Sequence, residues 1–269
     1  MNEPSENKSK VLTERRGRVF EVTINRPESM NAIDPETSDL LRRAFEVFRS
    51  DDELWVSILT GAGAKAFSTG NDLRAMSRAQ ASGKNTVSAA FSPIPFGGIT
   101  RDFVCWKPMI AAIRGYCLAG GLELALACDI RIAAADAKFG MPEVTRGLVA
   151  GAGGTQRLSR TVGLPAALEL LLSGKYVDAA WASSRQLVNE VVPSEDVLTR
   201  AREVADQISG NGPIAVRLTK QAILSGLDLT LAEGIALERS LSAEALGTAD
   251  AMEGPKAFVE KRRPQFQGR

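Results

Sequence analysis

Residues 115–125 read Gly-Tyr-Cys-Leu-Ala-Gly-Gly-Leu-Glu-Leu-Ala, a glycine-rich turn that leads into an apolar segment. The turn predicts that residues 122–127 begin a helix, and Glu123 lies within it between two leucines. A carboxylate buried without a partner is unstable, so Glu123 is expected to be paired, to have a shifted pKa or to face a wet cleft. This stretch therefore predicts a site at the start of a helix.

A second carboxylate follows in Gly140-Met141-Pro142-Glu143. Taken alone, Glu143 is better explained as an acid in the first turn of a helix, where the helix dipole favours negative charge. Glu123 is likewise consistent with a buried ion pair to an arginine such as Arg114. The glycines at 120–121 and 151–154, each taken in isolation, are consistent with plain turns or loops.

The composition describes an ordinary globular protein. The chain has 269 residues, of which 44% are hydrophobic and 24% charged, and its net charge is +1. Such a balance lacks the excess of one sign that nucleic acid or anionic lipid favours, so neither is expected as a partner. No apolar stretch approaches the roughly 20 residues of a membrane span, and residues 1–10 lack the apolar segment of a signal peptide. We expect a soluble, cytoplasmic protein with buried free thiols at Cys105, Cys117 and Cys128.

The chain contains no histidine. This excludes Ser-His-Asp and Cys-His nucleophiles and the common histidine-based zinc and non-haem iron sites. Acid and base chemistry is left to carboxylates, Lys, Tyr or Cys. Because no clustered Asp motif is present either, we expect neither a metal site nor a separate cofactor.

Short strands alternate with helical stretches through most of the sequence, which indicates an α/β fold. Asp34 followed by Pro35 predicts a helix to about residue 49, and Asp72 is a candidate cap of the next helix. Residues 82–98 are rich in Ser, Gly and Pro and are a candidate loop or lid. Strands are expected at residues 19–25, 56–59, 108–113, 129–134 and 138–139.

From about residue 193 the sequence pattern becomes typical of helices. Amphipathic stretches at 197–209 and 213–225, and a third at 229–246, predict a C-terminal helical region. We therefore divide the chain into a core, residues 1–196, which carries the site, and a helical region, residues 197–269. The strand-turn-helix units of the core can stack as a structural repeat.

An ordered series of motifs resembles the crotonase, or enoyl-CoA hydratase/isomerase, superfamily. The series runs from Ile24-Asn25-Arg26-Pro27 to Glu253-Gly254-Pro255-Lys256-Ala257-Phe258 and so covers nearly the whole chain. Between these ends lie residues 67–73 (Phe-Ser-Thr-Gly-Asn-Asp-Leu), 115–125, 128–130, 139–143, Gly147 and 151–158 (Gly-Ala-Gly-Gly-Thr-Gln-Arg-Leu). The resemblance implies a spiral of repeated ββα units with a C-terminal helical trimerisation region, assembled as trimers or hexamers.

The resemblance also implies the chemistry. In this superfamily two backbone N–H groups, here those of Asn71 and Gly120, form an oxyanion hole for the thioester of an acyl-CoA. The hydratases use two glutamates, and this chain keeps both at the family spacing. Glu123 then orients the nucleophilic water, and Glu143 exchanges a proton with that water and with the alpha carbon.

Further positions are carried over as binding residues. The adenine of coenzyme A is expected against the backbone near Ala66, and Gly70 and Asp72 are placed in the substrate site. From their positions alone, three basic residues are candidates to bind the phosphates of coenzyme A: Lys65, Arg26 and Lys261. The alternative is that their side chains are simply solvated at the surface.

Retention of both glutamates favours a 2-enoyl-CoA hydratase that forms 3-hydroxyacyl-CoA. A delta-isomerase, or a crotonobetainyl-CoA hydratase or racemase-like member, is the alternative. Residues 96–100 resemble the latter, and Arg146, where fatty-acyl hydratases usually have an apolar residue, is a candidate acyl-pocket residue. Clp-type peptidases share the fold but use a histidine. The RNA-binding branch of the family is disfavoured by the net charge of +1.

Overall fold

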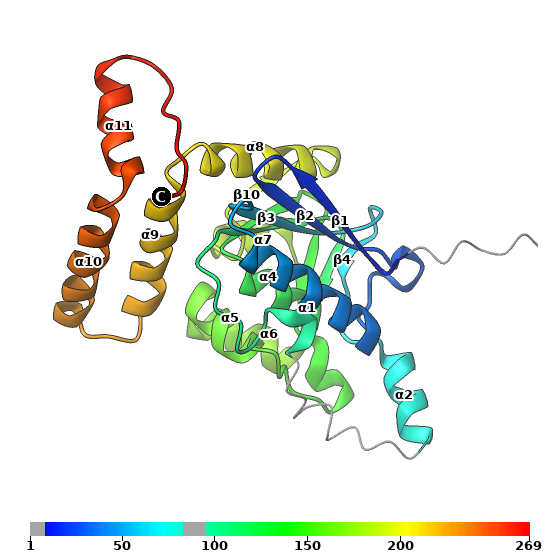
Figure 1. Ribbon diagram of the computed structural model, residues 1–269. Coiled ribbons are helices and arrows are strands. Elements are labelled where there is room, and N and C mark those ends of the chain that lie inside the picture. Colours follow the sequence, from blue (N-terminus) through cyan, green and yellow to red (C-terminus); the bar gives the residue numbers. More distant parts are fainter. Residues whose placement is uncertain (1–8, 83–94) are drawn as a thin grey trace, which may run out of the picture.

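Two β-sheets form the centre of the molecule in the computed structural model, which describes residues 9–82 and 95–269 (Figure 1). The larger, six-stranded sheet has the order β1-β2-β3-β5-β7-β10 and is parallel except for the β1–β2 hairpin. Its strands are β1 (Val11–Arg16), β2 (Val19–Ile24), β3 (Val56–Gly61), β5 (Met109–Ile113), β7 (Ile130–Ala134) and β10 (Glu190–Val192). The four-stranded sheet consists of β4 (Ala66–Ser68), β6 (Tyr116–Leu118), β8 (Lys138–Gly140) and β9 (Tyr176–Asp178).

Successive strands alternate between the two sheets, and this alternation produces the spiral. Strands β3, β5 and β7 lie in the larger sheet, and each is followed by a strand of the smaller one, β4, β6 or β8. After each pair comes a helix: α2 (Leu73–Ala81), α4 (Gly120–Ala127), and, beyond the short helix η3 (Pro142–Arg146), α5 (Gly154–Val162). The predicted α/β fold of repeated ββα units is confirmed.

Helices cover both faces of the larger sheet (Figure 1). Neighbouring residues of β2 point to opposite sides: the Phe20 ring stacks on Phe48 of α1 (Pro35–Ser50), whereas Glu21 pairs with Arg202 of α8 (Val197–Ser209). Helix α1 begins as predicted, because the Asp34 side chain accepts a hydrogen bond from the Thr37 N–H.

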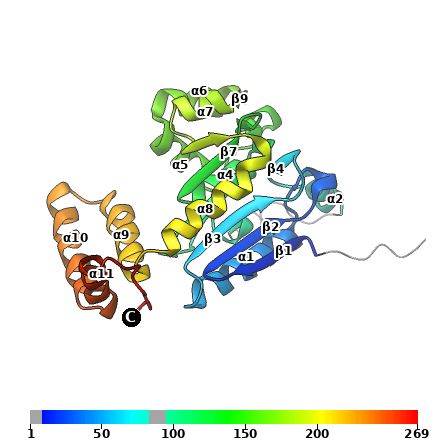
Figure 2. The same ribbon diagram turned by 90° about the horizontal axis from the view of Figure 1, so that it is seen from above.

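The C-terminal helices leave the core and stand beside it (Figures 1 and 2). They are α9 (Pro213–Gly226), α10 (Leu231–Leu246) and α11 (Ala249–Val259). Helix α8, the first helix of the predicted C-terminal region, packs across the larger sheet with Val197, Ala201 and Ala205 buried. Apolar residues at this spacing form the buried stripe of an amphipathic helix. Lys220 of α9 donates to the Asp129 carboxylate at 2.7 Å and so ties the helical region to the core.

The remaining elements are short. They are the helices α6 (Leu164–Ser173) and α7 (Ala179–Ser184) and the single-turn segments η1 (Pro27–Ser29), η2 (Phe96–Gly98) and η4 (Ser194–Asp196). Of the loop or lid predicted at 82–98, residues 83–94 lie outside the described residues. Within the described ranges, no helix is long and apolar enough to cross a membrane.

Close backbone contact between β4 and β6 requires glycine at 115. Gly115 has φ +60°, and a Cβ added there would lie 2.1 Å from the Lys65 carbonyl oxygen. The next residue, Tyr116, donates its N–H to that same oxygen at 3.0 Å. The glycine thus sets the approach of the two strands whose ends lead to residues 71 and 120.

We expect Gly115→Ala to destabilise the protein far more than Gly17→Ala. Gly17 lies in the β1–β2 turn with a similar φ of +59° but has nothing within 4 Å of an added Cβ. Gly17→Ala should lower the free energy of unfolding by about 1 kcal/mol, the cost of a left-handed conformation. Gly115→Ala should lower it by about 2 kcal/mol more, because the added methyl group also clashes with backbone. Urea denaturation of both variants measures the difference, and equal losses would contradict the close-contact explanation.

Candidate active site

The turn before α4 holds a strained residue. Ala119 has φ 50° and ψ −129°, a conformation that residues with a side chain rarely adopt, and its N–H donates to the Gly140 carbonyl at 2.9 Å. Its own carbonyl accepts the Glu123 N–H at 3.0 Å and so starts the helix. Among the described residues, no acceptor is recorded for the Gly120 N–H that follows.

Asn71 lies against this turn. A Cβ added at Gly70, which has φ +82°, would lie only 2.6 Å from the Gly120 nitrogen. Asn71 forms a parallel bridge with Ile33, in which Ile33 bonds to residues 70 and 72. The Asn71 N–H is therefore directed away from Ile33. Gly70, which directly precedes Asn71, thus lies against the turn that carries Gly120. The role of the two amides as an oxyanion hole stays a prediction.

Glu123 is buried, with 4% of its surface exposed, and binds backbone amides. Its Oε1 accepts the N–H groups of Ala152 at 2.7 Å and Gly154 at 2.8 Å. Burial raises the pKa of this carboxyl, while the two amides and the positive charges of Arg157 and Arg101 oppose the rise. Among the described residues Glu123 forms no ion pair with Arg114, and its partners are main-chain donors at the start of α5.

The sequence reasoning did not identify Ala152, Gly154 or Arg157 as partners of Glu123. A glycine run before a helix is a known anion-binding pattern and could have signalled the first two. Gly154 is required sterically, since an added Cβ would lie 2.9 Å from the Glu123 oxygen. Arg157 donates to the carbonyls of Thr100 at 2.9 Å and Ala152 at 3.3 Å, which fixes this loop.

Glu143 is half-buried at the start of η3, and its Oε2 is buried without a hydrogen-bond partner in the described part of the chain. Burial, together with the negative charge of Glu123, raises the pKa of Glu143 to about 6, against opposing effects from its own backbone amide and Arg146. The two carboxylates therefore interact electrostatically. An unpartnered oxygen on a carboxyl titrating near neutrality can exchange protons with a ligand.

Arg146 is exposed and folds back on η3. Its guanidinium donates to the Pro142 carbonyl and to the Thr145 hydroxyl, both at 3.1 Å. Its charge opposes the rise in the pKa of Glu143. Its assignment to an acyl pocket stays a prediction.

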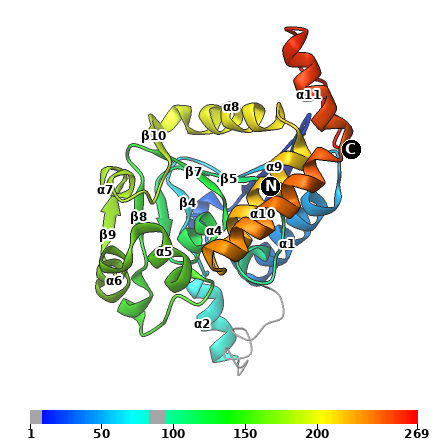
Figure 3. The same ribbon diagram turned by 90° about the vertical axis from the view of Figure 1, so that its left-hand side faces the viewer.

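The predicted binding residues occupy different places. Ala66 is buried in β4, with its carbonyl accepting the Asn31 amide at 2.7 Å, while the Lys65 side chain is exposed. Arg26 and Asp72 bond to each other at 2.9 Å. Lys261 follows α11, a helix that stands apart from α4 in all three views (Figures 1–3). A single chain thus does not bring Lys261 to the glutamates.

The described residues, 9–82 and 95–269, contain no group of three or more Cys, Asp or Glu that could hold a metal ion. The buried thiols of Cys117 and Cys128 have raised pKa values because of burial, and that of Cys128 is about 12. Such thiols are protonated at neutral pH.

We expect Glu143→Gln to stabilise the protein above pH 6. The pKa of Glu143 rises from 4.5 to about 6 on folding, so the folded state holds an extra proton between these values. Stability of the wild type therefore falls as pH rises through this window and then levels off. Thermal denaturation of both proteins from pH 4 to 8 should show the variant gaining relative stability across it. A difference that does not change with pH would contradict the raised pKa.

Comparisons with known proteins agree with this architecture. The family model described as enoyl-CoA hydratase/isomerase matches residues 14–269. A probable enoyl-CoA hydratase, echA8, of Mycobacterium tuberculosis is 40% identical over 259 residues, which cover 96% of this chain and 98% of that protein. The carnitinyl-CoA dehydratase of Citrobacter koseri is 40% identical over 261 residues, or 95% of this chain and 97% of that protein.

Solved structures extend the agreement to the fold. The crystal structure of enoyl-CoA hydratase from Mycobacterium tuberculosis H37Rv has a TM-score of 0.89 and 40% identity, covering 97% of this chain and 99% of that one. The match spans the spiral core and the C-terminal helices alike. The chain described here belongs to the enoyl-CoA hydratase/isomerase family and has the crotonase fold.

Proposed function

We propose that this protein is a 2-enoyl-CoA hydratase, which adds water to an enoyl thioester to give 3-hydroxyacyl-CoA. The observation that carries the proposal is the pair of glutamates: Glu143 has a raised pKa, in part because of the charge of Glu123. Two interacting carboxyls whose environments differ can divide proton transfer and water orientation between them. Delta-isomerisation, which moves a proton between carbons, requires only one such group.

The proposed oxyanion site combines the segment that carries Asn71 with the turn that carries Gly120. Attack of water on C3 moves the electrons of the C2=C3 bond toward the thioester oxygen, which becomes an enolate oxygen. In this proposal the N–H groups of Asn71 and Gly120 donate to that oxygen, and the dipole at the N-terminus of α4 favours the developing negative charge. Both donors are main-chain groups, which need no reorganisation as charge develops.

The glutamates then handle the proton. Glu123 keeps Oε1 on the Ala152 and Gly154 amides, so its second oxygen is left to hold the water. A water O–H bond breaks as the C3–O bond forms, and Glu143 takes up that proton and returns a proton to C2. The enolate collapses to the thioester, so atoms and charge balance without a metal or redox cofactor.

We expect Glu123→Gln and Glu143→Gln each to lower kcat by about 100- to 10,000-fold, because each removes one proton-handling group. The assay follows loss of the enoyl thioester absorbance with crotonyl-CoA. Glu169→Gln is the matched control, since Glu169 lies on the surface of α6, paired with Lys175. Full activity in either site variant would refute the two-carboxylate mechanism. A panel that includes crotonobetainyl-CoA and 3-enoyl-CoA would reveal the alternative activities.

We further propose that the protein assembles as a trimer, or as a dimer of trimers, through the C-terminal helices. Large apolar side chains remain exposed there, including Phe258 at 85% and Val259 at 79% on α11 and Leu231 at 81% on α10. Patches of this kind mark protein interfaces. A neighbouring copy would then bring its Lys261 toward a ligand, as the family resemblance implies. The cytoplasmic location stays a prediction from sequence.

We expect Phe258→Glu to shift the protein toward smaller species, because a charge on the exposed face of α11 cannot be buried without a partner. Sedimentation velocity over a range of concentrations measures the change. Val47→Glu on α1 is the control, since Val47 is exposed outside the helical region. A monomeric wild type, or a Phe258 variant that sediments like wild type, would contradict this assembly.

A further inference from the structure

The segment that carries Asn71 is held by an earlier part of the chain. The Ile33 N–H donates to the Gly70 carbonyl at 2.8 Å, and the Asp72 N–H donates to the Ile33 carbonyl at 3.0 Å. These two bonds bracket Asn71 and set the direction of its N–H. The position of this amide therefore depends on what fixes residues 32–33 relative to residue 72.

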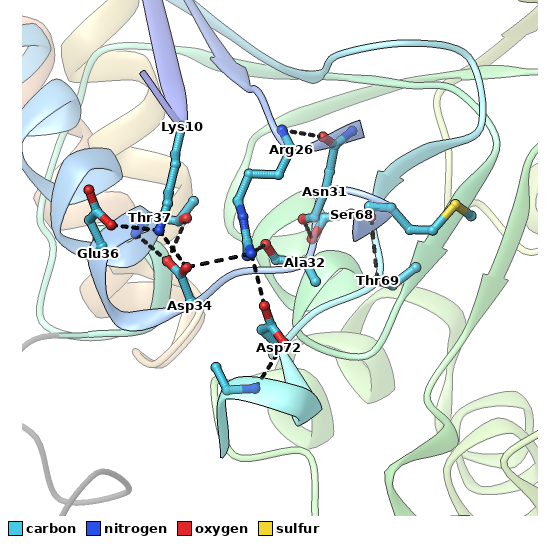
Figure 4. Close-up of polar contacts among 12 residues, drawn as sticks. Lys10, Arg26, Asn31, Ala32, Asp34, Glu36, Thr37, Ser68, Thr69 and Asp72 are labelled. Atoms are coloured by element: carbon cyan, nitrogen blue, oxygen red, sulfur yellow. Dashed lines mark hydrogen bonds and ion pairs between the residues drawn. The ribbon is translucent and has the colours of Figure 1, made fainter. Parts of the chain in front are cut away.

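One guanidinium joins both sides of this bracket (Figure 4). Arg26 donates through Nη1 to the Ala32 carbonyl at 2.5 Å and through Nη2 to Asp72 Oδ2 at 2.9 Å. Ala32 directly precedes Ile33, and Asp72 directly follows Asn71. Arg26 is thus a strut between the strand-like segment at 33 and the segment at 70–72.

The strut is itself fixed. The Arg26 backbone N–H donates to the Asn31 side chain at 2.9 Å, and the amide of that buried Asn31 donates to the carbonyls of Ala62 at 3.0 Å and Ala66 at 2.7 Å. The Arg26 side chain is only 12% exposed, and Asp34 lies 3.5 Å from Nη2. Figure 4 shows the guanidinium enclosed between the Asp34 and Asp72 carboxylates. Its charge is balanced inside the protein.

Asp72 is used at both oxygens. Oδ2 accepts from Arg26, while Oδ1 accepts the Ala75 N–H at 3.1 Å and caps α2. Burial acts to raise the pKa of Asp72, but the Ala75 amide and Arg26 outweigh it and lower the pKa below its ordinary value. Asp72 therefore stays ionised at neutral pH and links the strut to the start of α2.

We propose that Arg26 is a positioning residue for the Asn71 amide and not a ligand of the coenzyme A phosphates. The proposal rests on the proposed hydratase function and deepens it. Rigid main-chain donors are effective only at the correct distance, and a displacement of about 1 Å can reduce a rate about 100-fold. Arg26 acts on the reaction through Ala32 and Asp72, without touching the substrate.

The first experiment separates positioning from phosphate binding. Arg26→Ala should lower kcat with crotonyl-CoA about 10- to 100-fold, while the dissociation constant of free coenzyme A, measured by calorimetry, should change less than about twofold. A phosphate ligand would give the reverse: weaker coenzyme A binding with kcat at saturation retained. That result would overturn the proposal.

Gentler variants cover the case in which Arg26→Ala does not fold. Arg26→Lys keeps the charge but cannot reach both acceptors with a planar fork, and Asp72→Asn keeps a capping side chain for α2 but loses the ion pair. Both variants should lower kcat, as Arg26→Ala does. Because they weaken one strut, the double variant should lose little more than the worse single variant. Additive losses, or no loss, would overturn the proposal.

A spectroscopic readout distinguishes positioning from general destabilisation. An acyl-CoA with an electron-donating aryl group conjugated to the thioester should absorb at longer wavelength when bound, because the oxyanion donors polarise its carbonyl. The Arg26 variants should show a smaller shift. Arg202→Ala is the matched control: it breaks the 2.7 Å ion pair to Glu21 on the other face of the larger sheet and should leave the shift and kcat unchanged.

The outcomes separate this proposal from the proposed function. A wild-type protein that hydrates no enoyl-CoA removes the hydratase assignment, yet the band shift of the bound probe still tests Arg26. A wild type that hydrates crotonyl-CoA, with Arg26 variants equal to it in kcat and band shift, removes only the positioning role. A shift reduced as much by Arg202→Ala as by Arg26→Ala also overturns it.

Discussion

The need to accommodate the buried carboxylate of Glu123 organises the site. A charge placed between leucines at the start of an apolar helix requires donors, and the chain supplies the Ala152 and Gly154 amides at 2.7 and 2.8 Å. This interaction joins α4 to the beginning of α5, and Arg157 secures the connecting loop from the other side. The negative charge of Glu123 also contributes, together with the partial burial of Glu143, to the raised pKa of Glu143. One electrostatic requirement thus connects two helices and the second carboxyl.

The donors proposed for the oxyanion hole depend on close backbone packing. Gly70 and Gly120 approach so closely that no side chain fits between them, and Ala119 adopts a strained conformation in the turn between β6 and α4. Strain of this kind persists only where surrounding contacts enforce it. Here the contacts are main-chain hydrogen bonds to Gly140, Ile33 and residues 70–72, together with the strut of Arg26. The backbone at the site is thus held by main-chain hydrogen bonds and by one buried side chain, Arg26.

Much of the fold was predictable because its signals are local. The cap at Asp34, the proline after it and the apolar spacing that followed specified α1, and the long buried strands of the larger sheet were recognised from their composition. Strands β4, β6 and β9 have only three residues each, and of the smaller sheet only β8 was expected. Their pairing partners lie far away in sequence, so no local pattern identifies them. Amphipathicity predicted helix α8 but did not reveal that it covers the larger sheet, because the pattern does not specify the surface on which a helix packs.

By itself, the sequence determined the class of fold, the identity of the two glutamates, the glycine turns and the exclusion of histidine chemistry, because residue type and order carry that information. Only the tertiary structure decided the partners. It assigned Glu123 to the amides of Ala152 and Gly154 instead of an arginine, and it enclosed Arg26 between Asp34 and Asp72 instead of leaving it at the surface. The physical reason is that desolvation and hydrogen-bond geometry depend on groups distant in sequence, which only folding brings into contact.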